Sequence, residues 1–154
     1  PIERTVFDLL INKGMTFASA ESCTGGNIAH VITLIPGSSD VFKGTAVTYA
    51  TTMKTKVLGV PSVTIEEHGV VSQDVVERMA IGVRNLMEAD FGIATTGVAG
   101  PSGGTEETPV GTVWIGLASP SGVVSKRFNF GKDRENVINR ATIAAYEMLR
   151  QQLM

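Results

Sequence analysis

Short apolar runs that suit β-strands alternate with longer segments of helical periodicity along most of the chain. The apolar spacing predicts helices over residues 2–13, 25–35, 51–58 and 72–90 and from about residue 134. Strands are expected over residues 15–22, 42–50, 91–97, 112–118 and 123–130. The turn "SPSG" joins the last two strands into a hairpin. This order predicts an α/β fold: a three-layer α/β/α sandwich with a mixed, mainly parallel sheet and one antiparallel hairpin.

The ends of two of these helices carry recognisable capping residues. Ser72 is expected to cap the long helix that follows it, while Thr51 and Thr52 are candidate caps for the short helix through Leu58. The long helix is strongly amphipathic, so one stripe is expected to face the core. The residues of this stripe are Val76, Met79, Ala80, Val83, Leu86 and Met87.

Length and charge limit the classes of protein that fit. A chain of 154 residues is the size of one domain, and no linker or repeat divides residues 1–154. A net charge of -2 lacks the electrostatic footprint of a general nucleic-acid binder. No apolar run reaches the roughly 18 residues of a membrane span, and "PIERTVFDLL" is too charged for a signal peptide. We therefore expect a cytoplasmic protein whose main partner is neither nucleic acid nor a membrane.

The stretch "AESCTGG", residues 20–26, places two potential nucleophiles where a strand is expected to run into a helix. A helix beginning at Thr24 or Gly25 would direct free N–H groups toward a bound anion or a developing oxyanion. Gly25 and Gly26 would let a ligand approach the backbone. The same spacing also suits an ordinary strand-to-helix turn, with Thr24 as its cap. Neighbouring strand residues point to opposite faces, so only one of Ser22 and Cys23 is expected to face a site.

A serine nucleophile needs a base, and the sequence offers few candidates. His30 lies two turns along the following helix, and His68 is expected in a loop. Lys54 and Lys56 lie on the short helix after the second strand; either would need a pKa lowered from about 10.4 to about 7 or 8. Cys23 is the rival nucleophile, although a small buried thiol is the more common role for such a residue. As the single cysteine, it can form neither an internal disulfide nor a multi-cysteine metal site.

Two further segments could bind a ligand. "TTGVAGPSGG" follows the strand over residues 91–97, and its glycines would let backbone N–H groups approach a phosphate or ribose. The spacing is not that of a Walker loop, and a turn-rich connection explains it equally well. "GKDRENV" places Lys132 and Arg134 at the start of the last helix, where an arginine could pair with a phosphate or simply be exposed.

Taken together, these segments resemble the C-terminal domain of the CinA family, the competence/damage-inducible proteins whose members include nicotinamide mononucleotide deamidases. The matching stretches follow the family's order and spacing over nearly the whole chain. They are "AESCTGG", "VTYATTMKTKVLGV", "HGVVSQDVVERMA", "TTGVAGPSGGTEETPVGTVW" and "FGKDRENV". The resemblance implies hydrolysis of nicotinamide mononucleotide to nicotinic acid mononucleotide and ammonia, with no metal or organic cofactor, by a protein that forms a homodimer.

The resemblance also implies roles for individual residues. Ser22 falls on the family's serine nucleophile and Lys54 on its lysine base, with Tyr49 close by. The oxyanion would be held near Thr24, Gly25 and Gly26. The ribose phosphate side would be bound by Thr96, Gly97, Gly100, Gly103, Gly104 and Arg134. The alternatives are a nucleotide-binding or protein-interaction module without catalysis, and a hydrolase that uses Cys23.

Three positions depart from the family's pattern. Thr108 stands where members commonly have lysine, Lys132 where they have glycine, and Ile138 where they have a further arginine. All three fall in the region assigned to the phosphate. They are therefore expected to bear on substrate affinity or on the identity of the substrate.

Overall fold

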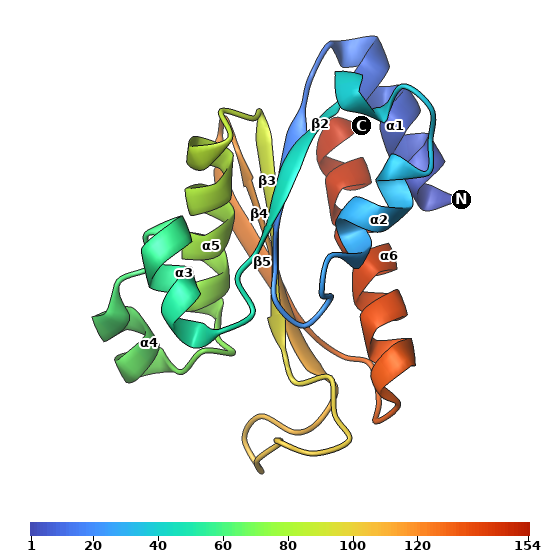
Figure 1. Ribbon diagram of the computed structural model, residues 1–154. Helices are drawn as coiled ribbons and strands as arrows, with labels where there is room; N and C mark the ends of the chain where they lie inside the picture. The colour runs from blue at the N-terminus through green and yellow to red at the C-terminus, as the bar shows by residue number, and fades with distance from the viewer.

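The computed structural model describes all 154 residues as a five-stranded sheet between two layers of helices (Figure 1). Helices α1, α2 and α6 cover one face, and α3, α4 and α5 lie on the other. The elements in chain order are α1 Ile2–Lys13, β1 Phe17–Glu21, α2 Asn27–Thr33, a 3-10 turn Ser38–Asp40, β2 Phe42–Val47, α3 Thr51–Leu58, α4 Ser62–His68, α5 Gln73–Leu86, β3 Phe91–Gly97, β4 Thr112–Ser119, β5 Gly122–Asn129 and α6 Arg134–Leu153. None of the helices has the length and apolar character needed to cross a membrane.

The strand order is β2-β1-β3-β4-β5, and the predicted α/β sandwich with a mixed sheet and a hairpin is confirmed. β1 pairs in parallel with both β2 and β3, while β3–β4 and β4–β5 are antiparallel. Helices connect the parallel strands, whereas a glycine-rich loop returns the chain from β3 directly to β4. The carboxyl ends of the parallel strands β1, β2 and β3 therefore lie together at one edge of the sheet.

Each face of the sheet has its own core. On one face, residues such as Leu10, Ile28 and Tyr146 join α1, α2 and α6 to the strands. On the other, Met79 and Val83 of α5 pack against small residues of β1 and β3. Close approach of α5 requires a glycine at position 92, because a Cβ there would lie 2.3 Å from the carbonyl oxygen of Ala80.

Several predicted boundaries are corrected by the structure. α2 begins at Asn27, two or three residues later than expected, because the turn before it is longer. Ser72 caps α5 as predicted, accepting a hydrogen bond from the amide of Val75. Ala50, rather than Thr51 or Thr52, occupies the N-cap position of α3.

Two further expectations on the α5 side of the sheet were wrong. Leu86 is 53% exposed instead of buried, since it lies in the last turn of α5. Helix α4 was not predicted. His68, which was expected in a loop, is the last residue of this helix. With only seven residues after Pro61, α4 is too short to show a helical apolar period.

Candidate functional site

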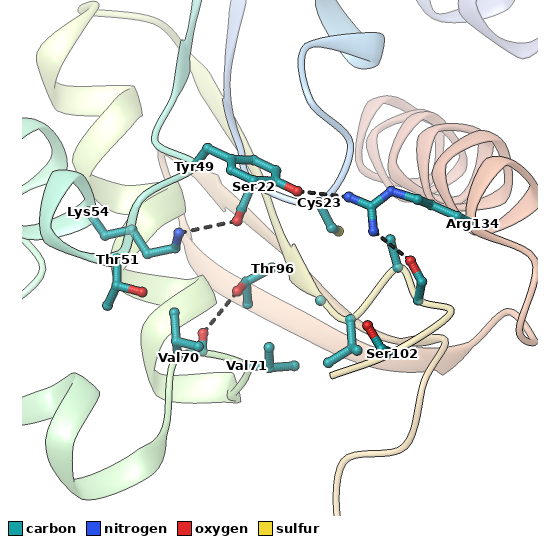
Figure 2. A pocket seen from close by; sticks show the side chains of 14 residues that line it. Ser22, Cys23, Tyr49, Thr51, Lys54, Val70, Val71, Thr96, Ser102 and Arg134 are labelled. Carbon is teal, nitrogen blue, oxygen red and sulfur yellow. Dashed lines mark hydrogen bonds between the residues drawn. The ribbon is translucent and has the colours of Figure 1, made fainter. Parts of the chain in front are cut away.

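A cavity of about 290 Å³ lies at the carboxyl ends of β1, β2 and β3, which is where open α/β sheets commonly bind ligands (Figure 2). Each strand delivers part of the lining: the turn after β1, the segment between β2 and α3, and the end of β3 with the loop that follows. The cavity brings together seven of the residues expected in the site. These are Ser22, Tyr49, Lys54, Thr96, Gly97, Gly100 and Arg134.

At the centre of the cavity Ser22 and Lys54 are in direct contact. Nζ of Lys54 lies 3.2 Å from Oγ of Ser22 and donates a hydrogen bond to the carbonyl oxygen of Thr48 at 2.7 Å. Lys54 comes from the first turn of α3, which begins four residues after β2 ends, so the short connection directs its side chain back over the strand ends. The side chain is only 1% exposed.

The surroundings of Lys54 favour a neutral amine. Burial lowers the pKa of Lys54 from its usual value of 10.5. No carboxylate forms an ion pair with it, and its two polar neighbours are Thr48 O and Ser22 Oγ. An ammonium group has three N–H donors and would leave one without an acceptor, whereas a neutral amine keeps a lone pair for the Ser22 hydroxyl. The pair therefore has the geometry of a nucleophile and its base.

This burial is expected to have a cost that depends on pH. The unfolded chain holds the proton on Lys54 up to a higher pH than the folded chain does, so folding becomes more favourable as the pH rises between the two pKa values. The free energy of unfolding of Lys54→Met minus that of the parent should be largest at pH values below the pKa of Lys54 in the folded chain. It should fall toward pH 10.5, by about 1.4 kcal/mol for each unit by which the pKa is lowered. Urea unfolding of both proteins at several pH values measures the difference, and a constant difference would contradict the assignment.

Cys23 also lines the cavity, which corrects the expectation that only one of Ser22 and Cys23 faces it. Both residues follow the end of β1, so the alternation of a strand no longer applies to them. The Cys23 side chain is buried and forms part of the core beneath α2. Burial raises the pKa of the thiol to about 11, which leaves it protonated and a poor nucleophile at neutral pH.

The amide groups of the turn differ in their availability. The N–H of Gly25 donates to Ser22 O at 3.0 Å, and the N–H of Gly26 donates to Glu21 Oε1 at 3.2 Å. The amides of Cys23 and Thr24 have no acceptor within the chain. Our expectation that Gly25 and Gly26 offer free donors is therefore wrong, and Cys23 joins Thr24 as a possible donor to an oxyanion.

The N-terminus of α2 is occupied by a carboxylate of the protein itself. Glu21 is fully buried and accepts hydrogen bonds from six donors. These are the hydroxyls of Ser19, Thr24 and Thr45 and the amides of Gly26, Ile28 and Ala29, at 2.8 to 3.2 Å. Glu21 therefore orients its neighbours in this turn and does not face water. The positive end of the helix is thus used to hold the turn that carries Ser22.

The mouth of the cavity is framed by Tyr49 and Arg134. Tyr49 is 58% exposed, and its hydroxyl accepts a hydrogen bond from Nη2 of Arg134 at 2.8 Å. Nη1 of the same guanidinium donates to Gly100 O at 2.6 Å. This pair of contacts joins the start of α6 to the segment after β2 and to the glycine-rich loop. Deeper in the cavity, Oγ1 of Thr96 donates to Val70 O at 2.9 Å.

Other expected residues lie outside the cavity. Thr24, Gly25, Gly26, Gly103 and Gly104 do not line it, nor do Thr108, Lys132 and Ile138. Gly104 instead closes the loop, because a Cβ there would lie 2.5 Å from the amide nitrogen of Val110.

Neither histidine takes part in the cavity. His30 is exposed, and Nε2 of His68 lies 3.3 Å from Oδ2 of Asp74. No cluster of three or more His, Cys, Asp or Glu side chains could hold a metal ion.

Seven further residues line the cavity, and of these only Cys23 was a candidate from the sequence. They are Cys23, Thr51, Val70, Val71, Val98, Ala99 and Ser102. Val70 and Val71 come from the segment between α4 and α5, and the apolar side chains give the cavity walls suited to a flat ring. The stretch "HGVV" belonged to the matched family pattern, which was the one available signal for this wall.

Comparisons with known proteins agree with this architecture. The family described as "CinA C-terminal domain" matches residues 1–153. A CinA-like protein of Flavobacterium psychrophilum is 47% identical over 99% of the chain, and the nicotinamide-nucleotide amidohydrolase PncC of Shewanella oneidensis is 45% identical over 94% of it. The chain spans 37% and 34% of the lengths of these two relatives.

A solved structure extends the match to three dimensions. The crystal structure of a competence-damaged protein (CinA) superfamily protein from Klebsiella pneumoniae superposes with a TM-score of 0.95 at 34% identity, covering 99% of this chain and 95% of that one. The agreement therefore covers the whole sandwich, including the strand ends that form the cavity. The chain belongs to the CinA family, through the C-terminal domain that the family description matches from residue 1 to residue 153.

Proposed function

We propose that this domain hydrolyses the carboxamide of nicotinamide mononucleotide, giving nicotinic acid mononucleotide and ammonia. The observation that carries the proposal is the contact between Ser22 Oγ and the buried Nζ of Lys54 inside the cavity. A relative that is 45% identical is named a nicotinamide-nucleotide amidohydrolase, which supports the choice of substrate.

The first half of the reaction forms an acyl-enzyme. Neutral Lys54 accepts the hydroxyl proton of Ser22 while Oγ attacks the amide carbon, and the carbonyl oxygen becomes an oxyanion. The unpaired amides of Cys23 and Thr24 are the donors available to that oxyanion. When the tetrahedral intermediate collapses, the C–N bond breaks and Lys54 passes its proton to the departing nitrogen. Ammonia leaves, and the acyl group remains on Ser22.

The second half releases the acid. A water molecule takes the place vacated by ammonia and gives a proton to Lys54 as its oxygen attacks the ester carbon. The bond to Ser22 Oγ then breaks and the proton returns from Lys54 to the serine. The acid formed in this way loses its remaining proton to solvent and becomes the carboxylate, and both side chains recover their starting protonation states.

The rest of the cavity supplies groups for the remainder of the nucleotide. The apolar walls that include Val70, Val71 and Val98 suit the flat nicotinamide ring. Arg134, at the mouth and at the first position of α6, is the cation placed to pair with the phosphate. Thr96, Gly97 and Gly100 also line the cavity and offer polar contacts to the ribose.

The proposal is tested by incubating the purified protein with nicotinamide mononucleotide and measuring both products. We expect ammonia and nicotinic acid mononucleotide in equal amounts, with no requirement for an added metal. A brief acid quench should trap an acyl adduct on Ser22 that mass spectrometry identifies. Binding of the nucleotide without any turnover would instead favour a non-catalytic nucleotide-binding module.

A further inference from the structure

The cavity is lined by basic side chains but by no acidic one. Among the residues that line it, Lys54 and Arg134 are the basic ones, and no aspartate or glutamate is present. This arrangement is unexpected for the proposed substrate, because the nicotinamide ring of the mononucleotide carries a fixed positive charge. The ring has to enter a cavity that offers no counter-ion and already holds an amine.

The ionisable groups around Lys54 do not alter this picture. Those on the surrounding elements are Glu21, Cys23, Tyr49, Lys56, Glu66, Glu67, His68, Asp74, Glu77, Arg78, Arg84 and Arg134. The carboxylate of Glu21 is enclosed by its six donors, and Asp74 is paired with His68. A thiolate at Cys23 would raise the pKa of Lys54, but this thiol is protonated and uncharged at neutral pH. The charge state of Lys54 is therefore sensitive to whatever charge enters the cavity.

A productively bound substrate brings its own charge close to this amine. The reacting carbon must approach Ser22 Oγ to about 3 Å, and the ring nitrogen is separated from that carbon by two ring bonds and the bond to the carboxamide. With Nζ 3.2 Å from Oγ, a ring nitrogen placed on the Lys54 side of the reacting carbon would lie roughly 6 Å from Nζ. The phosphate lies farther away, toward Arg134, which Figure 2 shows across the cavity from Lys54.

We infer that the cationic ring of the substrate adds to burial in keeping Lys54 neutral, so that the domain selects positively charged pyridinium carboxamides over uncharged carboxamides of the same shape. The inference rests on the proposed function and adds a substrate class to it. Two positive charges about 6 Å apart at an effective dielectric constant of about 20 repel each other enough to lower the pKa of Lys54 by roughly two units. Binding thus converts more of the lysine to the form that can act as a base.

Kinetics with a matched pair of substrates test the inference. The second substrate is the analogue with a benzamide ring in place of the pyridinium, which keeps the carboxamide, ribose and phosphate but has no ring charge. The acid limb of kcat/KM reports the free enzyme and that of kcat the complex. For each substrate, the pKa of the acid limb of kcat is subtracted from that of kcat/KM. This difference should be larger for nicotinamide mononucleotide than for the analogue, by roughly two pH units. Equal separations for the two substrates would overturn the inference.

Proton release on binding gives an independent measurement. In Ser22→Ala, which keeps Lys54 but has no nucleophile, nicotinamide mononucleotide should release a proton between the two pKa values of Lys54, and the benzamide analogue should release less. Calorimetry in buffers with different ionisation enthalpies counts the protons. The double variant Ser22→Ala/Lys54→Met is the control and should show no such difference. Equal release by both ligands overturns the inference alone, whereas absence of binding and turnover of either ligand overturns the proposed function as well.

Discussion

Ser22→Ala and Lys54→Met are each expected to lower kcat for nicotinamide mononucleotide by a factor of about 10³ or more. Without the hydroxyl no acyl-enzyme can form, and without the amine nothing takes the proton of Ser22. The two residues act as one unit, so the double variant should be little worse than either single variant. Steady-state ammonia release measures the loss, and circular dichroism checks that the variants are folded.

Two neighbouring positions provide controls for this loss. Lys56→Met removes an exposed lysine from the same helix and should leave kcat nearly unchanged. Cys23→Ala removes the buried thiol and should reduce turnover far less than Ser22→Ala does. An inactive Cys23→Ala beside an active Ser22→Ala would show that the cysteine is the nucleophile and would refute the serine mechanism.

Glu21→Ala is expected to destabilise the fold by at least about 4 kcal/mol. The substitution removes the acceptor for six donors in the interior, three of them backbone amides at the start of α2. Each buried donor without an acceptor costs about 1–3 kcal/mol, although some of the hydroxyls can find new partners. Because domains of this size are stable by only about 5–15 kcal/mol, the variant should be close to unfolding in mild urea.

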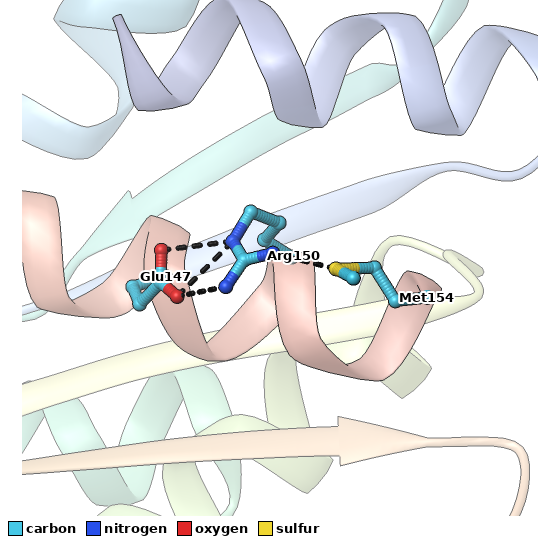
Figure 3. A network of polar contacts seen from close by, with 3 residues as sticks. All are labelled: Glu147, Arg150 and Met154. Atoms are coloured by element: carbon cyan, nitrogen blue, oxygen red, sulfur yellow. Dashed lines mark hydrogen bonds and ion pairs between the residues drawn. The ribbon is translucent and has the colours of Figure 1, made fainter.

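Glu147→Ala is the matched control for this substitution. Glu147 accepts hydrogen bonds from Nε and Nη2 of Arg150 at the surface near the end of α6, one helical turn away (Figure 3). Water reaches both side chains, and exposed ion pairs contribute little to stability. The urea midpoint should therefore stay near that of the parent. Equal and small effects of both substitutions would mean that the hydrogen bonds around Glu21 do not stabilise the turn.

Much of the architecture was predictable because local patterns and global topology agree. The amphipathic stripe of α5 and the cap at Ser72 located the longest helix of that face, and the strand-like runs located all five strands. The sequence predicted the mixture of strand directions from one hairpin. It did not show that β4 also runs antiparallel to β3, since that depends on where the glycine-rich loop takes the chain.

The site was less accessible to sequence reasoning, because its chemistry depends on contacts between distant segments. Ser22 and Lys54 could be proposed as partners through the resemblance, but the burial of Lys54 depends on how α3 packs over the strand ends. The sequence also could not show which backbone amides already donate a hydrogen bond. Gly25 and Gly26 are typical of an open turn, yet the N–H groups of both have acceptors within the chain. The wall formed by Val70 and Val71 follows a helix too short to leave a periodic signal.

Because Lys54 is buried, the lysine amines of this protein fall into two groups. The other lysines, Lys13, Lys43, Lys56, Lys126 and Lys132, are all exposed, whereas Lys54 is buried. Bulky amine-directed chemistry, such as coupling to a solid support or attachment of a fluorophore, should consume the exposed group and spare the buried one. The domain can therefore be immobilised or tagged through ordinary lysine conjugation with its reactive centre intact.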